Sequence, residues 1–491
     1  MKIAVIASLL LSILATTLFF GQNLGISVLL FVLPLILFTM FFLEKHRKVK
    51  NKKGCILVIP ILLLSSTYAI YQNMFFRVTN IIIMVTLYNI MLLWIMTEKY
   101  QLEFAIKRIF NIMIKPFHYI NETCKEIGKV FKINKMKTEE PSSSWKIIKQ
   151  IGTGIVVSIP ILIIVIALLA SADSLFAEGT QNVLLTIFEN GRVILDLPFW
   201  FTLVAKLLTI CALTIYFISY MINILSQKPW STKEEKTIKI QIETTILNTV
   251  VTILNIIYII FCKIQITNLF AKIATNDMID YANYAREGFF QLMAVSLINF
   301  IIIIISTKNN SQSSKMQIYY RKIMNLVLLV ATAIILSSAF IRMNLYGEEF
   351  GYTFLRILVY FALITESILL LPTIVYIFKD TFPVWKSYFI IITIMYVIMN
   401  FSNINQMIAK KNIDRYLNEG KKIDIYYLMK TKTDGLEEVI KLYETIEDQN
   451  LKYQLENYLD KMKNQLEEKE NIVEWNYSTW KARELLKREG V

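Results

Sequence analysis

The chain has 491 residues, of which 55% are apolar, and its formal net charge is +14. A soluble protein of this length normally forms roughly two to four domains with about half of its residues apolar. The apolar residues here gather in blocks that almost lack charge, which excludes an ordinary soluble protein. The basic residues lie in alternate connections between these blocks, which argues against a nucleic-acid partner.

Eleven apolar blocks are long enough to cross a bilayer. About 20 apolar residues in a helix span the roughly 30 Å hydrocarbon core, and the blocks lack the strict alternation of barrel strands. We therefore predict an all-α polytopic transmembrane bundle of about 11 spans. The predicted spans are 3–20, 26–43, 54–70, 79–96, 151–170, 199–225, 241–262, 289–306, 322–341, 353–378 and 387–401.

The distribution of lysine and arginine predicts the orientation of these spans. The connections 44–53, 97–150, 226–240, 307–322 and 379–386 together hold 27 basic residues. The opposite set, 21–25, 71–78, 171–198, 263–288 and 342–352, holds 6. Because basic connections stay in the cytoplasm, we predict a cytoplasmic N-terminus and an extracytoplasmic C-terminal region. One missed span would reverse the side of that region.

The spans and their connections predict four parts. Residues 1–96 form a four-span membrane region, 97–150 a basic cytoplasmic linker, 151–401 a seven-span core, and 402–491 a soluble helical domain. In the linker, the stretch 107–120 carries Lys107, Arg108 and Lys115 among apolar residues. It is predicted either to rest on the anionic cytoplasmic leaflet or to be a solvated connection.

The soluble C-terminal domain has nearly balanced charge and no block long enough to span. Helical periodicity from Glu437 to Glu470 predicts one amphipathic helix there. Thr433-Asp434-Gly435 is typical of a turn or cap that leads into it. The apolar side of this predicted helix carries Leu442, Ile446, Leu451, Leu455, Leu459 and Met462.

No motif of an enzyme, cofactor site or metal site is present. The sequence lacks phosphate-binding, metalloprotease, hydrolase and dinucleotide fingerprints, and its four cysteines show no metal-binding spacing. We therefore predict no cofactor and no metal, and an enzyme is disfavoured but left open.

Two ionisable residues lie inside predicted spans, where charge is costly. Glu366 is near the middle of the tenth span and Lys206 is about seven residues into the sixth. They predict either a buried pair or packing partner, or an ion or proton site. Five intramembrane asparagines are better explained as interhelical hydrogen-bonding residues: Asn89, Asn248, Asn255, Asn299 and Asn325.

A second set of polar residues gathers where spans meet the predicted outer surface. Its charges could pair in a partly desolvated network, so one interpretation is a polar clasp that fixes helix ends. The other is a site for an anionic ligand or lipid headgroup, because the arginine fork fits carboxylate and phosphate. The set comprises Asp173, Tyr284, Arg286, Glu287, Arg342, Tyr346, Glu349 and Arg356.

Several stretches from residue 150 onward resemble a known family. They are Ser171-Ala172-Asp173, Tyr281 to Phe289, Arg342…Tyr346…Gly351-x-Thr353…Arg356, Ile408-Ala409-x-x-Asn412-Ile413-x-Arg415, Asp424-x-x-Tyr427-Leu428 and Trp475-Asn476-x-Ser478. The chain is similar here to the uncharacterised polytopic bacterial membrane family called "domain of unknown function" 4173, with its sister group 4153. The resemblance implies a multi-pass membrane protein and brings no activity with it.

Three functions remain open at this point. The favoured hypothesis is a non-enzymatic envelope receptor or scaffold whose outer domain binds a protein partner or ligand. The alternatives are an ion- or proton-coupled transporter, suggested by Glu366 and Lys206, and a membrane enzyme acting on a lipid-linked substrate. Against transport, the spans show no inverted repeat.

Overall fold

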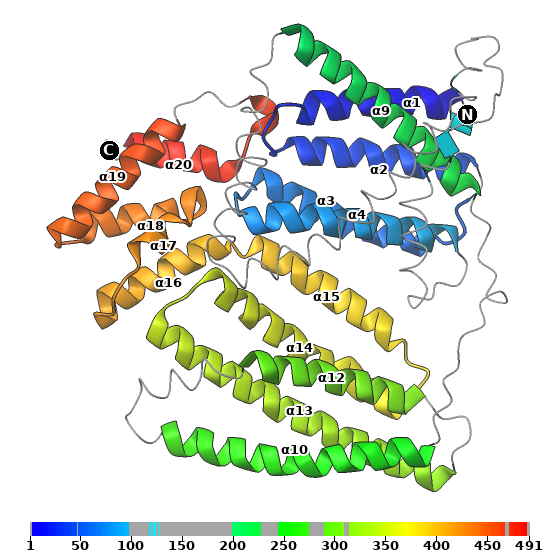
Figure 1. Cartoon of the computed structure of the whole chain (residues 1–491), viewed down its shortest axis with the longest axis vertical. Helices are drawn as coiled ribbons and strands as arrows, with labels where there is room; N and C mark the ends of the chain where they lie inside the picture. The colour runs from blue at the N-terminus through cyan, green and yellow to red at the C-terminus, as the bar shows by residue number, and fades with distance from the viewer. Residues whose placement is uncertain are drawn as a thin grey trace, which may run out of the picture. The chain divides into compact units, whose positions relative to one another are not determined.

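The computed structural model of the chain consists of helices and turns in all the residues that it describes (Figure 1). These are residues 2–46, 48–97, six positions between 116 and 127, 199–226, 244–273, 289–308, 314–466 and 471–488. Among them, ten helices are long and apolar enough to span a membrane. The protein is therefore an all-α polytopic membrane protein, as predicted.

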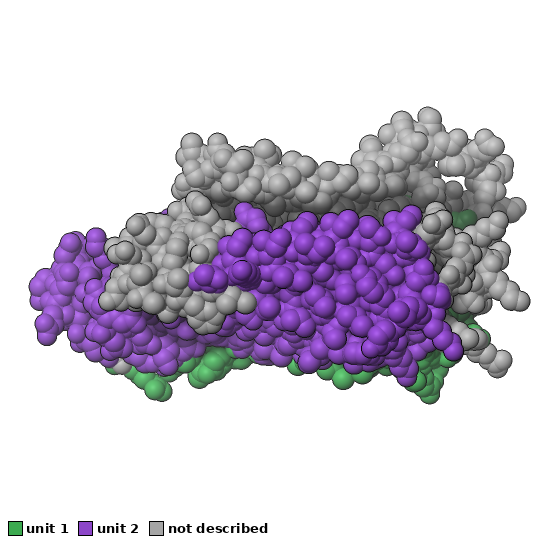
Figure 2. All heavy atoms as spheres, turned by 90° about the horizontal axis from the view of Figure 1, so that it is seen from below, with its two compact units in different colours: residues 1–234, 462–491 green, residues 235–461 purple. Residues whose placement is uncertain are grey.

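The ten described spans coincide with ten of the eleven predicted ones. The remaining prediction, 151–170, lies outside the described residues. Contacts divide the chain into two compact units, coloured separately in Figure 2: residues 1–234 with 462–491, and residues 235–461. We call them unit 1 and unit 2.

Unit 1 contains five of the described spans. In its first helix the small residues Ser8, Ser12 and Thr16 are all buried at four-residue spacing. Small residues at this spacing let helices in a membrane approach closely. The spans are α1 (Lys2–Phe19), α2 (Ser27–Lys45), the composite η1 (Lys52–Leu57), α3 (Val58–Ser66) and η2 (Thr67–Ala69), α4 (Met74–Met96), and α9 (Phe199–Ser226).

The composite third span requires a glycine where it meets α4. A Cβ on Gly54 would lie 2.9 Å from the Ile95 amide nitrogen and 2.7 Å from its side chain. The absence of a side chain lets η1 pack directly on the α4 backbone. The amides of Lys50 and Asn51 also donate to the Ile95 carbonyl, at 2.8 and 3.0 Å.

Unit 2 contains the other five described spans. Helix α13 has 36 residues, and at about 1.5 Å per residue it is nearly twice as long as the hydrocarbon core is thick. It therefore extends beyond the predicted span 322–341 at both ends. The spans are α10 (Thr244–Ile273), α12 (Phe289–Lys308), α13 (Lys315–Phe350), α14 (Phe354–Phe378) and α15 (Val384–Phe401).

Helices α10 and α13 run parallel, and side-chain donors at seven-residue spacing connect them. Asn248, Asn255 and Cys262 each donate to the backbone carbonyl of the residue 69 positions later, over 3.5, 2.9 and 3.9 Å. The constant offset fixes the register of the two helices. A seven-residue repeat is the period at which packed helices keep the same faces together.

Helix α12 runs antiparallel to α13 and also pairs with it through polar side chains. Asn299 donates to Thr332 at 3.0 Å, and Asn325 accepts from Ser306 at 2.8 Å. Asn299 also accepts from Tyr258 of α10 at 2.8 Å. These bonds are the interhelical role predicted for the asparagines. In unit 1, Asn89 likewise accepts from Tyr220 of another helix.

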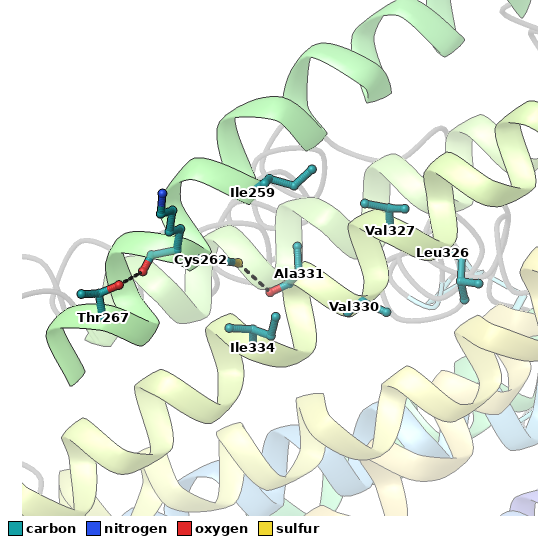
Figure 3. Close-up of a pocket in the computed structure, with 9 residues that line it drawn as sticks. Ile259, Cys262, Thr267, Leu326, Val327, Val330, Ala331 and Ile334 are labelled. Atoms are coloured by element: carbon teal, nitrogen blue, oxygen red, sulfur yellow. Dashed lines mark hydrogen bonds between the residues drawn. The ribbon is translucent and has the colours of Figure 1, made fainter. Parts of the chain in front are cut away.

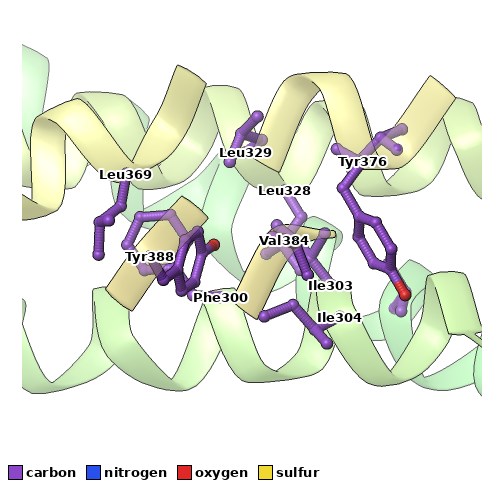
Figure 4. Packing of buried hydrophobic residues seen from close by; sticks show 11 residues of the cluster. Phe300, Ile303, Ile304, Leu328, Leu329, Leu369, Tyr376, Val384 and Tyr388 are labelled. Atoms are coloured by element: carbon purple, nitrogen blue, oxygen red, sulfur yellow. The ribbon is translucent and has the colours of Figure 1, made fainter. Parts of the chain in front are cut away.

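Buried side chains from all five spanning helices of unit 2 form one hydrophobic cluster (Figure 4). The Phe300 and Tyr388 rings meet edge to face at a centroid distance of 6.0 Å. The Tyr388 hydroxyl reaches Thr373 of α14 at 2.5 Å. The cluster therefore joins α12, α14 and α15, and the Tyr388 hydroxyl within it is hydrogen-bonded.

The C-terminal region consists of short helices and divides between the two units. The predicted helix 437–470 is two helices, broken at Ile446–Asp448. The predicted cap 433–435 lies inside the first of them, where a Cβ on Gly435 would meet Thr431 and Ala409. The helices are α16 (Ile404–Glu419), α17 (Ile425–Met429), α18 (Lys432–Thr445), α19 (Gln449–Leu466), η6 (Ile472–Glu474) and α20 (Tyr477–Arg488).

Candidate functional site: a helical domain clasped to a membrane turn

The structure describes four of the eight residues predicted to cluster at the outer surface. Asp173, Tyr284, Arg286 and Glu287 lie outside the described residues. The other four all belong to the end of α13 or the start of α14. They are Arg342, Tyr346, Glu349 and Arg356.

The turn between α13 and α14 leaves helix carbonyls without helical partners. Helix α13 ends at Phe350, and Gly351 follows with a φ of 80°, a conformation that favours glycine. The last carbonyls of any helix need donors from elsewhere. The side chains around this turn supply them.

Arg356 satisfies this turn from the first turn of α14. Its guanidinium donates to the Phe350 carbonyl at 2.9 Å and to the Gly351 carbonyl. It also stacks on the Tyr346 ring, 4.1 Å from the ring centroid. The two predicted residues Tyr346 and Arg356 are therefore in contact, and the arginine is bound to backbone oxygens.

Arg415 satisfies the same helix end from α16, more than 60 residues later in the sequence. Its Nε and Nη2 donate to the Glu348 carbonyl at 3.0 and 2.6 Å, and Nη2 also donates to the Glu349 carbonyl at 3.0 Å. The residue is only 7% exposed. Cationic donors at a helix C-terminus also favour the negative end of its dipole.

Asn412 lies one helical turn before Arg415 on α16. Its side chain binds both backbone groups of Tyr352, the residue after Gly351. Its Oδ1 accepts from the Tyr352 amide at 2.8 Å, and its Nδ2 donates to the Tyr352 carbonyl at 2.8 Å. In α17, the Tyr427 hydroxyl accepts from the Phe354 amide at 2.7 Å. Burial raises the pKa of the Tyr427 hydroxyl, so the group stays neutral.

We call this set of contacts the clasp: the turn 348–354 with Arg356, Asn412, Arg415 and Tyr427. The hydrogen bonds of these four side chains all end on backbone atoms of the turn. Lys421 adds an ion pair with Glu349 at 2.5 Å, half-exposed and therefore a small contribution. The clasp fixes the position of α16 and α17 on the membrane helices of unit 2.

Arg342 has a different partner from the other residues of the predicted cluster. Its Nη2 donates to Gln265 of α10 at 2.8 Å, and Gln265 also accepts from Ser338 at 3.0 Å. The arginine thus joins the α10–α13 contact. Sequence reasoning did not single out Gln265, because it lies just past the end of the predicted span.

The two intramembrane ionisable residues belong to different units. Glu366 of α14 is 5% exposed and accepts a hydrogen bond from Ser296 of α12. Lys206 of α9 is exposed in unit 1, and its ammonium lies 5.7 Å from the centroid of the Phe20 ring. Their pairing stays a prediction.

The C-terminal segment of unit 1 also contacts turns between spans. The Asn476 amide donates to the carbonyls of Tyr68 and Tyr71 at 2.8 and 3.1 Å. The Glu474 carboxylate accepts from the Asn23 amide at 3.0 Å. We call residues 471–488 the strap, because they bind the α1–α2 and η2–α4 connections together.

Gly25 makes this close approach of the strap possible. A Cβ at that position would lie 2.5 Å from the Glu474 carbonyl carbon and 2.9 Å from its Cα. The adjoining Ile26 amide donates to the Trp475 carbonyl at 3.1 Å. The backbone of the strap therefore packs directly on the α1–α2 connection.

In the clasp and the strap, Arg415, Asn412 and Asn476 bind backbone groups. Among the described residues, no group of three or more His, Cys, Asp or Glu side chains could hold a metal ion. The guanidinium groups of Arg356 and Arg415 are committed to carbonyl oxygens. The clasp is therefore suited to holding a domain in place.

Comparison with known families identifies the chain. A family profile described as "Domain of unknown function (DUF4153)" matches residues 58–442. The chain belongs to this family. The sequence resemblance indicated group 4173 with 4153 as its sister, whereas the profile match is to 4153 itself. The matched region begins in α3, whereas the sequence resemblance was predicted to begin near residue 150.

No curated protein and no solved structure gave a significant match to the chain. Within the chain, the family match includes every residue of the clasp. The strap and helices α1 and α2 lie outside the matched residues. The clasp therefore lies within the family region, and the strap lies outside it.

Proposed function

We propose that this multi-pass membrane protein is a non-enzymatic receptor or scaffold of the cell envelope. Its C-terminal helices, on the extracytoplasmic side, present a binding surface to a protein partner. The observation that carries the proposal is the clasp, because its cationic and amide donors hold α16 and α17 in place. A surface held in a fixed geometry binds with less loss of entropy.

The extracytoplasmic placement is supported by which turns the C-terminal helices contact. The strap contacts the α1–α2 and η2–α4 connections, and α16 contacts the α13–α14 turn. All three belong to the set of connections that is poor in lysine and arginine. Since basic connections are retained in the cytoplasm, this side is the outer one.

The same contacts bear on the number of crossings. Seven of the ten described spans lie between Gly25 and Gly351. If both turns face one side, the chain must cross the membrane an even number of times between them. The predicted eleven-span topology has eight crossings between these turns, the eighth being the span predicted at 151–170, and so agrees with this requirement.

Labelling from outside intact cells tests the placement. Gly420 ends α16 with nothing within 4 Å of its Cβ position, so Gly420→Cys in a cysteine-free background gives an accessible thiol. A membrane-impermeant maleimide is expected to label this variant, and to label Lys48→Cys only after lysis. The reverse pattern would place the C-terminal helices in the cytoplasm and overturn the proposal.

Photocrosslinking in living cells tests the binding role. Tyr426 of α17 and Tyr453 of α19 are 69% and 65% exposed, so a photoreactive residue at either position samples the proposed surface. A discrete crosslinked protein is expected in the wild-type background. It should be lost in the clasp variant Asn412→Ala and retained in Glu366→Gln. A crosslinked protein that is still captured by the Asn412→Ala variant would contradict the proposal.

One observation favours an ion- or proton-coupled transporter as a second candidate. Glu366 is a buried carboxyl in a spanning helix, with a hydroxyl partner from a neighbouring span, and such groups commonly mark ion or proton pathways. Glu366→Gln keeps a hydrogen-bonding side chain and removes the ionisable group. A transporter is expected to lose ion-coupled uptake in this variant while it still folds. Unchanged uptake rules this candidate out.

A further inference from the structure

A groove runs along the side of unit 2 between α10 and α13 (Figure 3). Its volume is about 550 Å³, within the range of small-molecule sites. Two of its lining side chains are polar, Lys263 and Thr267, and the rest are apolar or sulfur-containing. The apolar set is Ile259, Cys262, Leu326, Val327, Val330, Ala331 and Ile334.

The groove is a consequence of how the two helices pack. Cys262 and Ala331 form its floor, where the thiol meets the Ala331 carbonyl and both side chains are small and buried. Ile259 and Val330 form its walls and are 58% and 55% exposed. The hollow therefore opens sideways from two spanning helices, toward the hydrocarbon of the bilayer.

Lys263 lies one helical turn before Thr267, the last lining residue of α10, and near the end of the span. The apolar part of α10 runs from Thr244 to Gln265, so Lys263 is about 28 Å from its start at 1.5 Å per residue. This is close to the thickness of the hydrocarbon core. The exposed ammonium is therefore at the depth where the phosphates of one leaflet lie.

The groove extends from this lysine toward the membrane centre. The α10–α13 register pairs each α10 residue with the residue 69 positions later, which places Leu326 beside Ile257. Along α10, Ile257 lies about 9 Å below Lys263. A cation at phosphate depth above an apolar channel matches the charge and shape of a phospholipid.

We propose that this groove binds one anionic phospholipid, with its phosphate on Lys263 and one acyl chain along Val330 and Ile259. The lipid belongs to the leaflet on the side of the clasp, since Arg342 and the clasped end of α13 lie beyond Ile334 on the same helix. The ammonium supplies the preference for negative charge. Among the described residues no carboxylate pairs with Lys263.

Lipid retention by the purified full-length protein tests this proposal. The protein is reconstituted in nanodiscs of equimolar phosphatidylglycerol and phosphatidylcholine and extracted in mild detergent, and its retained lipids are counted by native mass spectrometry. One basic residue near an anionic headgroup is worth about 1 kcal/mol, so wild type should favour phosphatidylglycerol roughly fivefold.

Two pairs of variants test the contact with the headgroup and the contact with the groove separately. Lys263→Gln should retain both lipids equally, whereas Lys206→Gln, an exposed lysine in a span of unit 1, should behave like wild type. Val330→Trp fills the groove and should retain neither lipid. Ile260→Trp, an exposed residue of α10 outside the groove lining, should retain both.

Three results would overturn the proposal. The first is equal retention of the two lipids by wild type, and the second is an unchanged preference in Lys263→Gln. The third is a dimer in the mass spectrum that Val330→Trp abolishes, because the groove would then hold a second copy of the chain.

Discussion

At the scale of single residues, the clasp depends on atoms that bind backbone rather than other side chains. Asn412 satisfies both backbone groups of Tyr352, and Arg415 satisfies the carbonyls of Glu348 and Glu349. Lysine could supply charge at position 415 but not the planar fork that reaches two carbonyls. The residue types therefore follow from the geometry of the turn.

Two glycines at helix ends of unit 2 have positive φ but differ in ψ and in the space around them. Gly420 (φ 63°, ψ 18°) is left-handed, and alanine there costs about 1–2 kcal/mol of strain. Gly351 (φ 80°, ψ 178°) lies in a region that is essentially restricted to glycine, so alanine is strained there as well. Only at Gly351 would the new Cβ lie 2.8 Å from both Arg415 Nη1 and Asn412 Oδ1. Gly351→Ala should therefore lose roughly 1–3 kcal/mol more.

Thermal unfolding of the purified protein in detergent measures this difference. Gly351→Ala should melt several degrees below Gly420→Ala and should expose residues 404–461 to protease. Equal melting temperatures for the two variants would show that α16 does not hold the turn.

Asn412→Ala should release the same domain by a different route. It leaves the Tyr352 amide and carbonyl without their partner, which costs about 1–3 kcal/mol when such groups are buried. Asn418→Ala on the exposed face of α16 is the matched control and should change stability by less than about 0.5 kcal/mol. Protease cleavage of the C-terminal helices should be faster only in Asn412→Ala.

At the scale of helices, the sequence was most informative where length and hydropathy decide the outcome. Ten predicted spans correspond to described helices because apolar runs of this length have few alternatives in a bilayer. Hydropathy could not reveal that α13 continues through Arg342 to Phe350, since those polar residues are stabilised by Gln265 and the clasp. Nor could it place the break after Thr445.

The partners within the clasp were beyond the reach of sequence pattern. Tyr346, Glu349 and Arg356 were predicted as a cluster, but their partners Asn412 and Arg415 are about 60 residues later and were noted only within the family resemblance. Pairing over such a separation depends on the path of α14 and α15. The signal that could have identified it was the spacing of Asn412 and Arg415 on one helix face.

Helix α1 offers a prediction about close packing. Ser12 is fully buried and its hydroxyl bonds the Ser8 carbonyl, whereas Thr17 makes a similar bond on the exposed face. Ser12→Leu should force the helices of unit 1 apart and cost about 1–3 kcal/mol. Thr17→Leu should be close to neutral. Melting temperatures that fall equally in both variants would contradict this packing.

At the scale of the whole molecule, the strap returns the C-terminal region to the first helices of the chain. Its central residue, Asn476, is 1% exposed, whereas Asn471 in the same segment makes an exposed bond to Gln22. Asn476→Ala should destabilise docking by about 2–3 kcal/mol, and open the strap roughly 30- to 150-fold more often.

Trypsin cleavage at Lys481 and Arg483 of α20 reports this opening. The cleavage rate should rise by that factor in Asn476→Ala and remain near that of wild type in Asn471→Ala. Equal cleavage rates in all three proteins would show that the turns of unit 1 do not hold the strap.

The strap also has a consequence for biogenesis. The Asn23 amide and the Glu474 carboxylate that it meets are separated by 451 positions, and at about 5–20 residues per second the ribosome needs roughly 20–90 s to make the intervening polypeptide. Throughout that interval the Asn23 amide lacks its Glu474 acceptor. The first helices to enter the membrane are therefore among the last to gain all of their contacts. A nascent chain stalled before Glu474 would expose an α1–α2 connection without the strap, which quality-control proteases could recognise.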